Sequence, residues 1–365
     1  MTKQFTLLSV WIALMATPSL RAQDKNIPEK ISTKSFNTST LLWYAAPAQK
    51  WEEALPVGNG RLGAMVFGKN GEERIQLNEE TYWSGGPYST VVKGGYKVLP
   101  EIQKLVFEEK YLAAHNLFGR NVMGYPVEQM KYQCLANLHL FFKNTDSISN
   151  YKRWLDLETG ISGVSYNSNG INYQREVLAS SPDQVIVVRI TADKPGSISF
   201  TANLRGERNQ THSNYATDYF KMDPYGNDGL VLTGKSADYM GVEGKMKYEA
   251  RIKAVTEGGT VKTAGVDLII ENATAVTLYF AAATNFVNYK DVSANPHQRV
   301  DDYFKGIAQK NYSLILASAI ADHKKYFDRV KLQLKETENS YLPTTERLKK
   351  IQSESDPSMA ALSYQ

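Results

Sequence analysis

The chain has 365 residues, enough for one large domain or two ordinary ones. Hydrophobic residues make up 42% and charged residues 22%, as is typical of a soluble globular protein. With 42 basic and 38 acidic residues the net charge is +4, too near balance to indicate nucleic-acid binding by bulk charge. Cys134 is the only cysteine, which excludes an intrachain disulfide and a cysteine-based metal site.

The N-terminus has the pattern of an export signal, and we predict a signal peptide at residues 1–22. Lys3 supplies a positive charge, residues 5–20 are mostly apolar, and Ala22 suits a cleavage position. The apolar run is short for a membrane span and no second one follows, so we expect no membrane span. The mature protein is expected to start with a loose polar segment at residues 23–40 and to be periplasmic or extracellular.

Residues 41–290 show a mainly β pattern. Two alternating runs flank a turn at residues 168–170, and residues 185–190 are apolar on both faces, which indicates a strand buried on both sides. Gly258-Gly259 is expected to join two further runs as a hairpin turn. Many short strands with regular turn signals predict a large antiparallel β-sandwich.

One helix is predicted to interrupt the sandwich. Pro100 suits its first turn, and the apolar residues follow helical spacing up to Gly119. These apolar residues are Ile102, Leu105, Val106, Leu112 and Leu117.

The pattern changes after about Asn295 and predicts two helices within a helical linker at residues 291–340. Residues 341–365 are expected to begin another domain. Ser355 or Asp356 suits a helix cap, with Pro357 at the first helical position. Because the chain stops inside this helix, we expect the domain to continue beyond it.

The glycine-rich stretch that starts at Gly58 allows two interpretations. Gly58, Gly60 and Gly63 match the spacing of a dinucleotide-binding loop, which requires a following helix. Instead, alternating residues on both sides of a turn at 69–71 predict a hairpin downstream. The pattern therefore favours a tight turn between strands, although a turn alone does not require Asn59 and Arg61.

The motif "WEEALPVGNGRLGAMVFG", followed by "ERIQLNEETYWSGGP", resembles the N-terminal signature of glycoside hydrolase family 95. The resemblance continues to "LPTTERLKKI" and covers roughly residues 40 to 365, with a small departure at residues 135–138. It implies a β-supersandwich, a helical linker and an (α/α)6 catalytic barrel. It also implies an inverting hydrolase of α-L-fucosides or α-L-galactosides that needs no cofactor.

The resemblance further implies that the general acid and the water-activating residues belong to the barrel. We therefore assign no catalytic residue to this chain and expect it to end where the first barrel helix starts. The carboxylates that are present do not suggest an acid and base pair: Glu79 and Glu80 should point to opposite faces of a strand. Glu72 and Glu73 flank a turn and are expected to be solvated. The five histidines have no metal-ligand spacing, so no metal site is predicted.

Five residues are candidates for a supporting role, facing substrate or the barrel. Indole faces stack on sugars, and amide or carboxylate groups can bond to hydroxyls. The candidates are Asn59, Arg61, Asn78, Glu79 and Trp83. The alternative is structural: Trp83 anchors an interface, and Arg61 ties the turn to Glu79 by a salt bridge.

Three functions remain open on this evidence. The first is the N-terminal part of a secreted α-L-fucosidase-type hydrolase, whose partners are the missing barrel and glycans with terminal α-L-fucose or related L-sugars. The second is a stand-alone carbohydrate-binding module derived from such an enzyme. The third, an unrelated β-sandwich adhesin, is disfavoured by the two motifs.

Overall fold

The computed structural model describes residue 31 and residues 36–143, 147–207 and 220–365. The predicted signal peptide at residues 1–22 lies outside the described residues. In the described part of the chain, no helix is long and apolar enough to cross a membrane.

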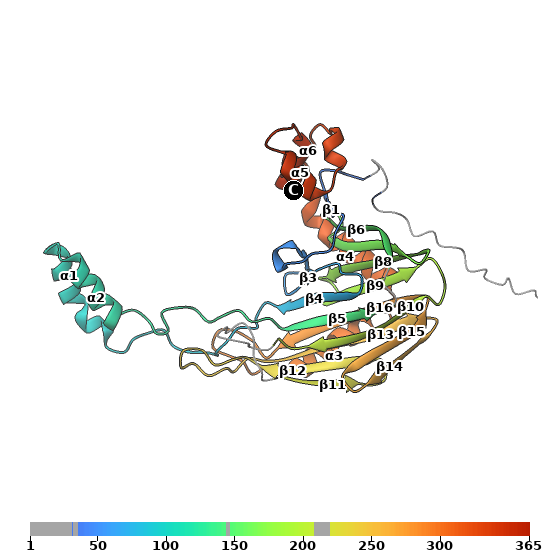
Figure 1. The fold of residues 1–365 in the computed structure, drawn as a ribbon. Coiled ribbons are helices and arrows are strands. Elements are labelled where there is room, and N and C mark those ends of the chain that lie inside the picture. The colour runs from blue at the N-terminus through green and yellow to red at the C-terminus, as the bar shows by residue number, and fades with distance from the viewer. Residues whose placement is uncertain (1–30, 32–35, 144–146, 208–219) are drawn as a thin grey trace, which may run out of the picture.

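Within these residues, the strands form two antiparallel sheets that face each other (Figure 1). The strands are β1 (Leu41–Tyr44), β2 (Leu55–Gly58), β3 (Leu62–Val66), β4 (Glu72–Glu79), β5 (Ala136–Phe142), β6 (Ile148–Asp156), β7 (Ile161–Ser168), β8 (Ile171–Ser180), β9 (Val185–Ala192), β10 (Ile198–Arg205), β11 (Phe220–Tyr225), β12 (Gly229–Lys235), β13 (Lys247–Glu257), β14 (Thr260–Ala264), β15 (Asp267–Ala273) and β16 (Ala275–Thr284). Sheet A has the order β1-β6-β7-β8-β9-β16-β13-β12-β11, and sheet B has the order β14-β15-β10-β5-β4-β3-β2. The predicted antiparallel β-sandwich is therefore confirmed.

Period-two alternation explains which side chains fill the space between the sheets. On β4, Ile75 and Leu77 point inward and are buried, while Arg74 and Gln76, which alternate with them, are partly exposed. Strands β9 and β16 lie at the centre of sheet A and are apolar on both faces, since helices cover the outer face of this sheet.

The inserted segment is two helices, α1 (Leu99–Phe107) and α2 (Tyr111–Asn121), where the sequence predicts one. The break lies at Glu109, which has a left-handed backbone with φ of 60°. A single-turn 3-10 helix, η2 (Gly95–Val98), precedes them. Figure 1 shows the pair at the end of two long segments, away from the sheets.

The Gly258-Gly259 pair does not form the predicted hairpin. β13 before it belongs to sheet A, whereas β14 after it pairs with β15 in sheet B. Both glycines have positive φ, 69° and 64°, so they turn the chain from one sheet to the other. Alternating runs around a glycine pair indicate two strands and do not specify that they share a sheet.

The C-terminal part is helical, as predicted. α3 (Pro296–Ile307) and α4 (Tyr312–Phe327) begin at Asn295 and Asn311, whose side chains accept hydrogen bonds from Gln298 N and Leu314 N. Apolar residues on these helices, including Val300, pack on the outer face of sheet A. The described chain ends with α5 (Thr344–Lys350) and α6 (Pro357–Tyr364).

The predicted helix start at the C-terminus is confirmed. Asp356 caps α6, accepting a hydrogen bond from Met359 N at 3.3 Å, and Pro357 opens the helix. Arg347 of α5 is buried, donates to both oxygens of Asp356, and also reaches the carbonyl oxygen of Thr38. The last two helices are thereby tied to the segment that leads into β1.

Candidate functional site

The β2–β3 turn is shaped by the Asn59 side chain. Its Oδ1 accepts hydrogen bonds from the backbone N–H groups of Arg61 and Leu62, at 3.1 and 2.7 Å. Its Nδ2 donates to the carbonyl oxygen of Ser180 at the end of β8. Asn59 therefore closes the turn of sheet B and attaches it to sheet A.

Arg61 extends from this turn into the space between sheet B, sheet A and α3. Its Nε donates to Gln184 Oε1 at 2.6 Å, and its Nη1 donates to the carbonyl oxygen of Ala282 at 2.6 Å. The guanidinium also stacks on the ring of Tyr303, 4.6 Å from its centroid, and lies 3.5 Å from Glu79 Oε1. The salt bridge of the structural alternative is thus present.

Glu79 is almost fully buried, and its second oxygen accepts hydrogen bonds from Thr81 N and Thr81 Oγ1. Burial raises the pKa of this carboxyl, and the Thr81 and Arg61 contacts partly oppose the rise. Asn78 is its neighbour on β4 and points to the opposite face of sheet B. The structure therefore brings Asn59, Arg61 and Glu79 together and keeps Asn78 apart from them.

Trp83 lies beside this cluster but faces a different space. Its Nε1 donates to the carbonyl oxygen of Glu80, and its ring meets Tyr132 edge to face at 5.1 Å. It lines a cavity of about 830 Å³ together with Thr81, which also bonds to Glu79, and with the exposed Tyr289. The proximity of this cavity to Glu79 leaves both interpretations of the five residues open.

Glu73 is buried, contrary to the prediction that it is solvated. It is 0% exposed, forms an ion pair with Arg175 of β8, and accepts a hydrogen bond from Gly68 N at 2.9 Å. Burial raises the pKa of Glu73, and the Arg175 charge opposes the rise. β4 begins at Glu72, directly after the turn; Glu73 takes an inward position with Arg175 as its partner, while Glu72 remains exposed.

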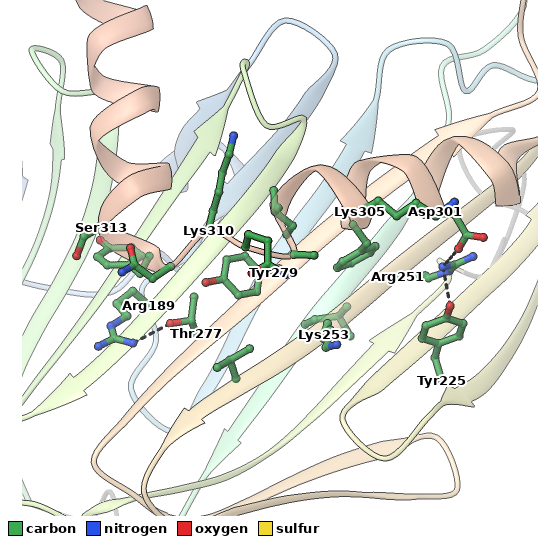
Figure 2. A pocket seen from close by; sticks show the side chains of 18 of the residues that line it. Arg189, Tyr225, Arg251, Lys253, Thr277, Tyr279, Asp301, Lys305, Lys310 and Ser313 are labelled. Atoms are coloured by element: carbon green, nitrogen blue, oxygen red, sulfur yellow. Dashed lines mark hydrogen bonds and ion pairs between the residues drawn. The ribbon is translucent and has the colours of Figure 1, made fainter.

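A second cavity, which no sequence pattern indicated, lies on the outer face of sheet A beside α3 and α4 (Figure 2). This groove has a volume of about 980 Å³, within the usual range for ligand sites. Tyr225 of β11, Tyr279 of β16 and Tyr312 of α4 contribute aromatic rings to its lining. Since its lining residues come from six elements far apart in the chain, no local motif could identify it.

The charged groups of the groove are held in fixed pairs. Arg251 donates to Tyr225 Oη at 3.0 Å and to Asp301 Oδ1 at 2.5 Å, while Arg189 donates to Thr277 Oγ1 at 2.8 Å. The hydrogen bond from Arg251 lowers the pKa of the Asp301 carboxyl, so this acid stays ionised and is unsuited to donate a proton. The groove therefore has the chemistry of a binding surface, with oriented polar groups beside aromatic rings.

Among the described residues, no group of three His, Cys, Asp or Glu side chains could hold a metal ion.

Residues 42–289 match the family model described as "Glycosyl hydrolase family 65, N-terminal domain". The chain therefore belongs to the glycosyl hydrolases that carry this N-terminal domain. Residues 311–365 match a second model, "Glycosyl hydrolase family 95 catalytic domain", which confirms the resemblance to family 95.

Curated relatives of this glycosyl hydrolase carry consistent names. "Alpha-L-fucosidase 2" of Arabidopsis thaliana is 31% identical over 356 residues, which are 89% of this chain and 41% of the relative. "Probable alpha-fucosidase A" of Aspergillus niger is 28% identical over 345 residues, 88% of this chain and 41% of the relative. The chain thus spans about two fifths of the length of these relatives.

Among solved structures, a putative kojibiose phosphorylase from human microbiome is similar to the glycosyl hydrolase chain. The TM-score is 0.49 at 10% sequence identity, over 83% of this chain and 40% of the other.

Proposed function

We propose that this chain is the N-terminal part of an exported hydrolase that releases terminal α-L-fucosyl or related α-L-galactosyl residues from glycans with inversion. We further propose that the chain alone is not catalytic and acts together with a C-terminal (α/α)6 barrel. One observation carries the proposal: an N-terminal-domain match and a catalytic-domain match follow each other in one chain, whose relatives are named α-fucosidases. The domain limits at residues 41, 291 and 341 remain predictions.

The carboxylates of the sandwich support the non-catalytic part of the proposal. Inverting hydrolysis needs two carboxyl-type groups that face each other across a sugar, about 6.5 to 9.5 Å apart. Glu73 and Glu79 are buried and paired with arginines, and Asp301 is paired with Arg251. Held in these pairs, the three carboxyls are not free to act as a general acid and a general base.

The test compares this chain with a longer protein that carries the catalytic domain of the same gene. Both are incubated with 2′-fucosyllactose, and the released sugar is followed by NMR so that its first-formed anomer is observed. We expect release of β-L-fucose by the longer protein and none by residues 23–365. Equal hydrolysis by the shorter chain, or no hydrolysis of any α-L-fucoside or α-L-galactoside by the longer protein, would overturn the proposal.

Export is inferred from the sequence pattern of residues 1–22 alone. The prediction is that the protein recovered from its natural source starts near Gln23. Mass spectrometry of the N-terminal peptide tests it, and a mature protein that retains residues 1–22 would contradict export by cleavage.

A role of the five candidate residues toward substrate or barrel is also proposed, and Trp83 offers the sharpest test. In the longer protein, a raised KM for Trp83→Ala would favour contact with substrate. An unchanged KM with a lower melting temperature would favour a structural anchor. Trp51→Ala is the matched control, because Trp51 is 50% exposed and does not line this cavity.

The groove on sheet A favours a second candidate function, binding of a saccharide by the chain itself. Tyr225 is 41% exposed there beside oriented Arg and Asp groups, an arrangement that suits a sugar ring and its hydroxyls. Titration of residues 23–365 with fucosylated oligosaccharides, followed by NMR, tests this function. Binding that is lost in Tyr225→Ala and retained in Tyr326→Ala, an exposed tyrosine outside the groove, would support it.

A further inference from the structure

A long arm leaves the sandwich between β4 and β5 and carries α1 and α2 at its tip (Figure 1). We define the arm as residues 85–130. At its base Ser84 and Lys131 exchange hydrogen bonds, with Ser84 N donating to Lys131 O and Lys131 N donating to Ser84 Oγ, both at 2.8 Å. The two segments that lead to the helices therefore leave the sandwich as a pair.

Close backbone contacts continue along the arm. A Cβ added to Gly124 would lie 2.5 Å from the carbonyl oxygen of Thr90, and one added to Gly95 would lie 2.5 Å from that of Asn121. Side chains at these two positions are thus excluded by the opposite segment. The arm is consequently a specific structure that presents its tip at a distance from the sheets.

The tip buries little of its apolar surface. Within the described structure α1 has no buried residue, and α2 has only Ala114. Phe107 is 87% exposed and Leu112 is 75% exposed, and Tyr111 is also largely exposed. Helices of 9 and 11 residues are marginal in water without tertiary packing, and an apolar cluster of this kind marks an interaction site.

The charges of the tip favour a protein surface as the occupant. Residues 99–121 carry three acidic groups, Glu101, Glu108 and Glu109, and three basic groups, Lys104, Lys110 and Arg120. This balance gives no attraction to phosphates or to an anionic lipid surface. Exposed aromatic and aliphatic side chains with balanced charge are instead typical of the centre of a protein interface.

We propose that the tip of the arm docks on the catalytic domain of the same protein. The inference rests on the proposed function, in which such a domain follows α6. The relatives are 41% covered by this chain, so most of their length is available to cover the tip, and the catalytic-domain match already begins at residue 311. A domain in the same chain also has a high effective concentration near the tip, which a second copy lacks.

Hydrogen exchange measured by mass spectrometry tests the proposal. Peptides of residues 99–121 are compared between residues 23–365 and the longer protein, at two protein concentrations. We expect exchange at least about tenfold slower in the longer protein, independent of concentration. Equal exchange in the two proteins would overturn the proposal, as would protection that rises with concentration together with dimers in sedimentation, which would assign the tip to a second copy.

A matched pair of variants separates apolar docking from charge. In the longer protein, Leu112→Asp should return the exchange of residues 99–121 to the rate of the shorter chain. Asn116→Asp adds the same charge one helical turn away and should leave most of the protection. If neither variant loses protection, or if both lose it equally, apolar docking at Leu112 is overturned. Hydrolysis of 2′-fucosyllactose by the same wild-type sample is measured in parallel, so a failure of the proposed function is recognised separately.

Discussion

Replacing Arg61 by Met should destabilise the sandwich without any ligand present. Met keeps an unbranched apolar stem and removes the guanidinium, which bonds Gln184 and Ala282 O and faces the buried Glu79. A hydrogen bond to a charged group contributes about 1.5–3 kcal/mol, and breaking a buried ion pair costs about 3–5 kcal/mol. These values overlap because one group makes all the contacts, so we expect a total loss of about 3–5 kcal/mol in the free energy of unfolding.

Urea unfolding of residues 23–365 measures this loss. Arg74→Met is the control, because Arg74 is 35% exposed and lies 3.8 Å from Glu207, a pair that should contribute less than about 1 kcal/mol. The double variant R61M/E79Q should lose less than the sum of the two single variants, by at least about 1 kcal/mol, since no buried carboxylate is left unpaired. A loss for Arg61→Met equal to that of the control, or strict additivity in the double variant, would refute the reasoning.

Two further predictions concern the crossing between the sheets and the C-terminal helices. Gly259→Ala should lower the free energy of unfolding by more than about 2 kcal/mol, because φ is positive and the new Cβ would lie 2.3 Å from Glu271 O. Gly265→Ala, where φ is also positive but no atom lies within 4 Å, should cost only about 1 kcal/mol, and equal losses in denaturant unfolding would contradict the steric argument. Burial alone raises the pKa of Asp356, but hydrogen bonds from Arg347 and Ser340 and the Arg347 charge lower it overall. Since the unfolded state then binds the proton more tightly, this stabilisation is present above the usual Asp pKa of about 3.9 and is lost as pH falls below it. Unfolding measured between about pH 6 and pH 3 should show a smaller acid-induced loss in Asp356→Asn than in the wild type, and parallel curves would contradict this assignment.

Local patterns in the sequence were sufficient for most elements of the fold. Alternation located the strands around the turn at residues 168–170, and the Asp356-Pro357 pair located the start of α6. The pairing of Arg61 with Glu79 was also predicted, as the structural alternative for these two residues, because a hairpin brings the two strands side by side. These features depend on residues near in sequence or on adjacent strands.

Features that depend on distant parts of the chain could not be predicted from the sequence. Glu73 is acidic and flanks a turn, so its burial follows only from Arg175, which lies about a hundred positions later. The Gly258-Gly259 pair separates two sheets because β14 finds its partner in β15 rather than in β13. The groove and the solvent exposure of the arm likewise depend on how elements are arranged in space, which a one-dimensional period does not contain.

Hydrogen bonds join the two ends of the described chain, and they affect the order in which the protein folds during synthesis. Thr38 Oγ1 lies 2.6 Å from Ser358 Oγ, and the N–H of Trp43 donates to Thr344 Oγ1 at 3.0 Å, over separations of 320 and 301 residues. The hydroxyl of Thr38 and the N–H of Trp43 therefore hydrogen-bond to water until the ribosome has released α5 and α6. At about 5–20 residues per second, this delay lasts on the order of tens of seconds. The first strand to leave the ribosome is in this sense among the last parts of the sandwich to be completed.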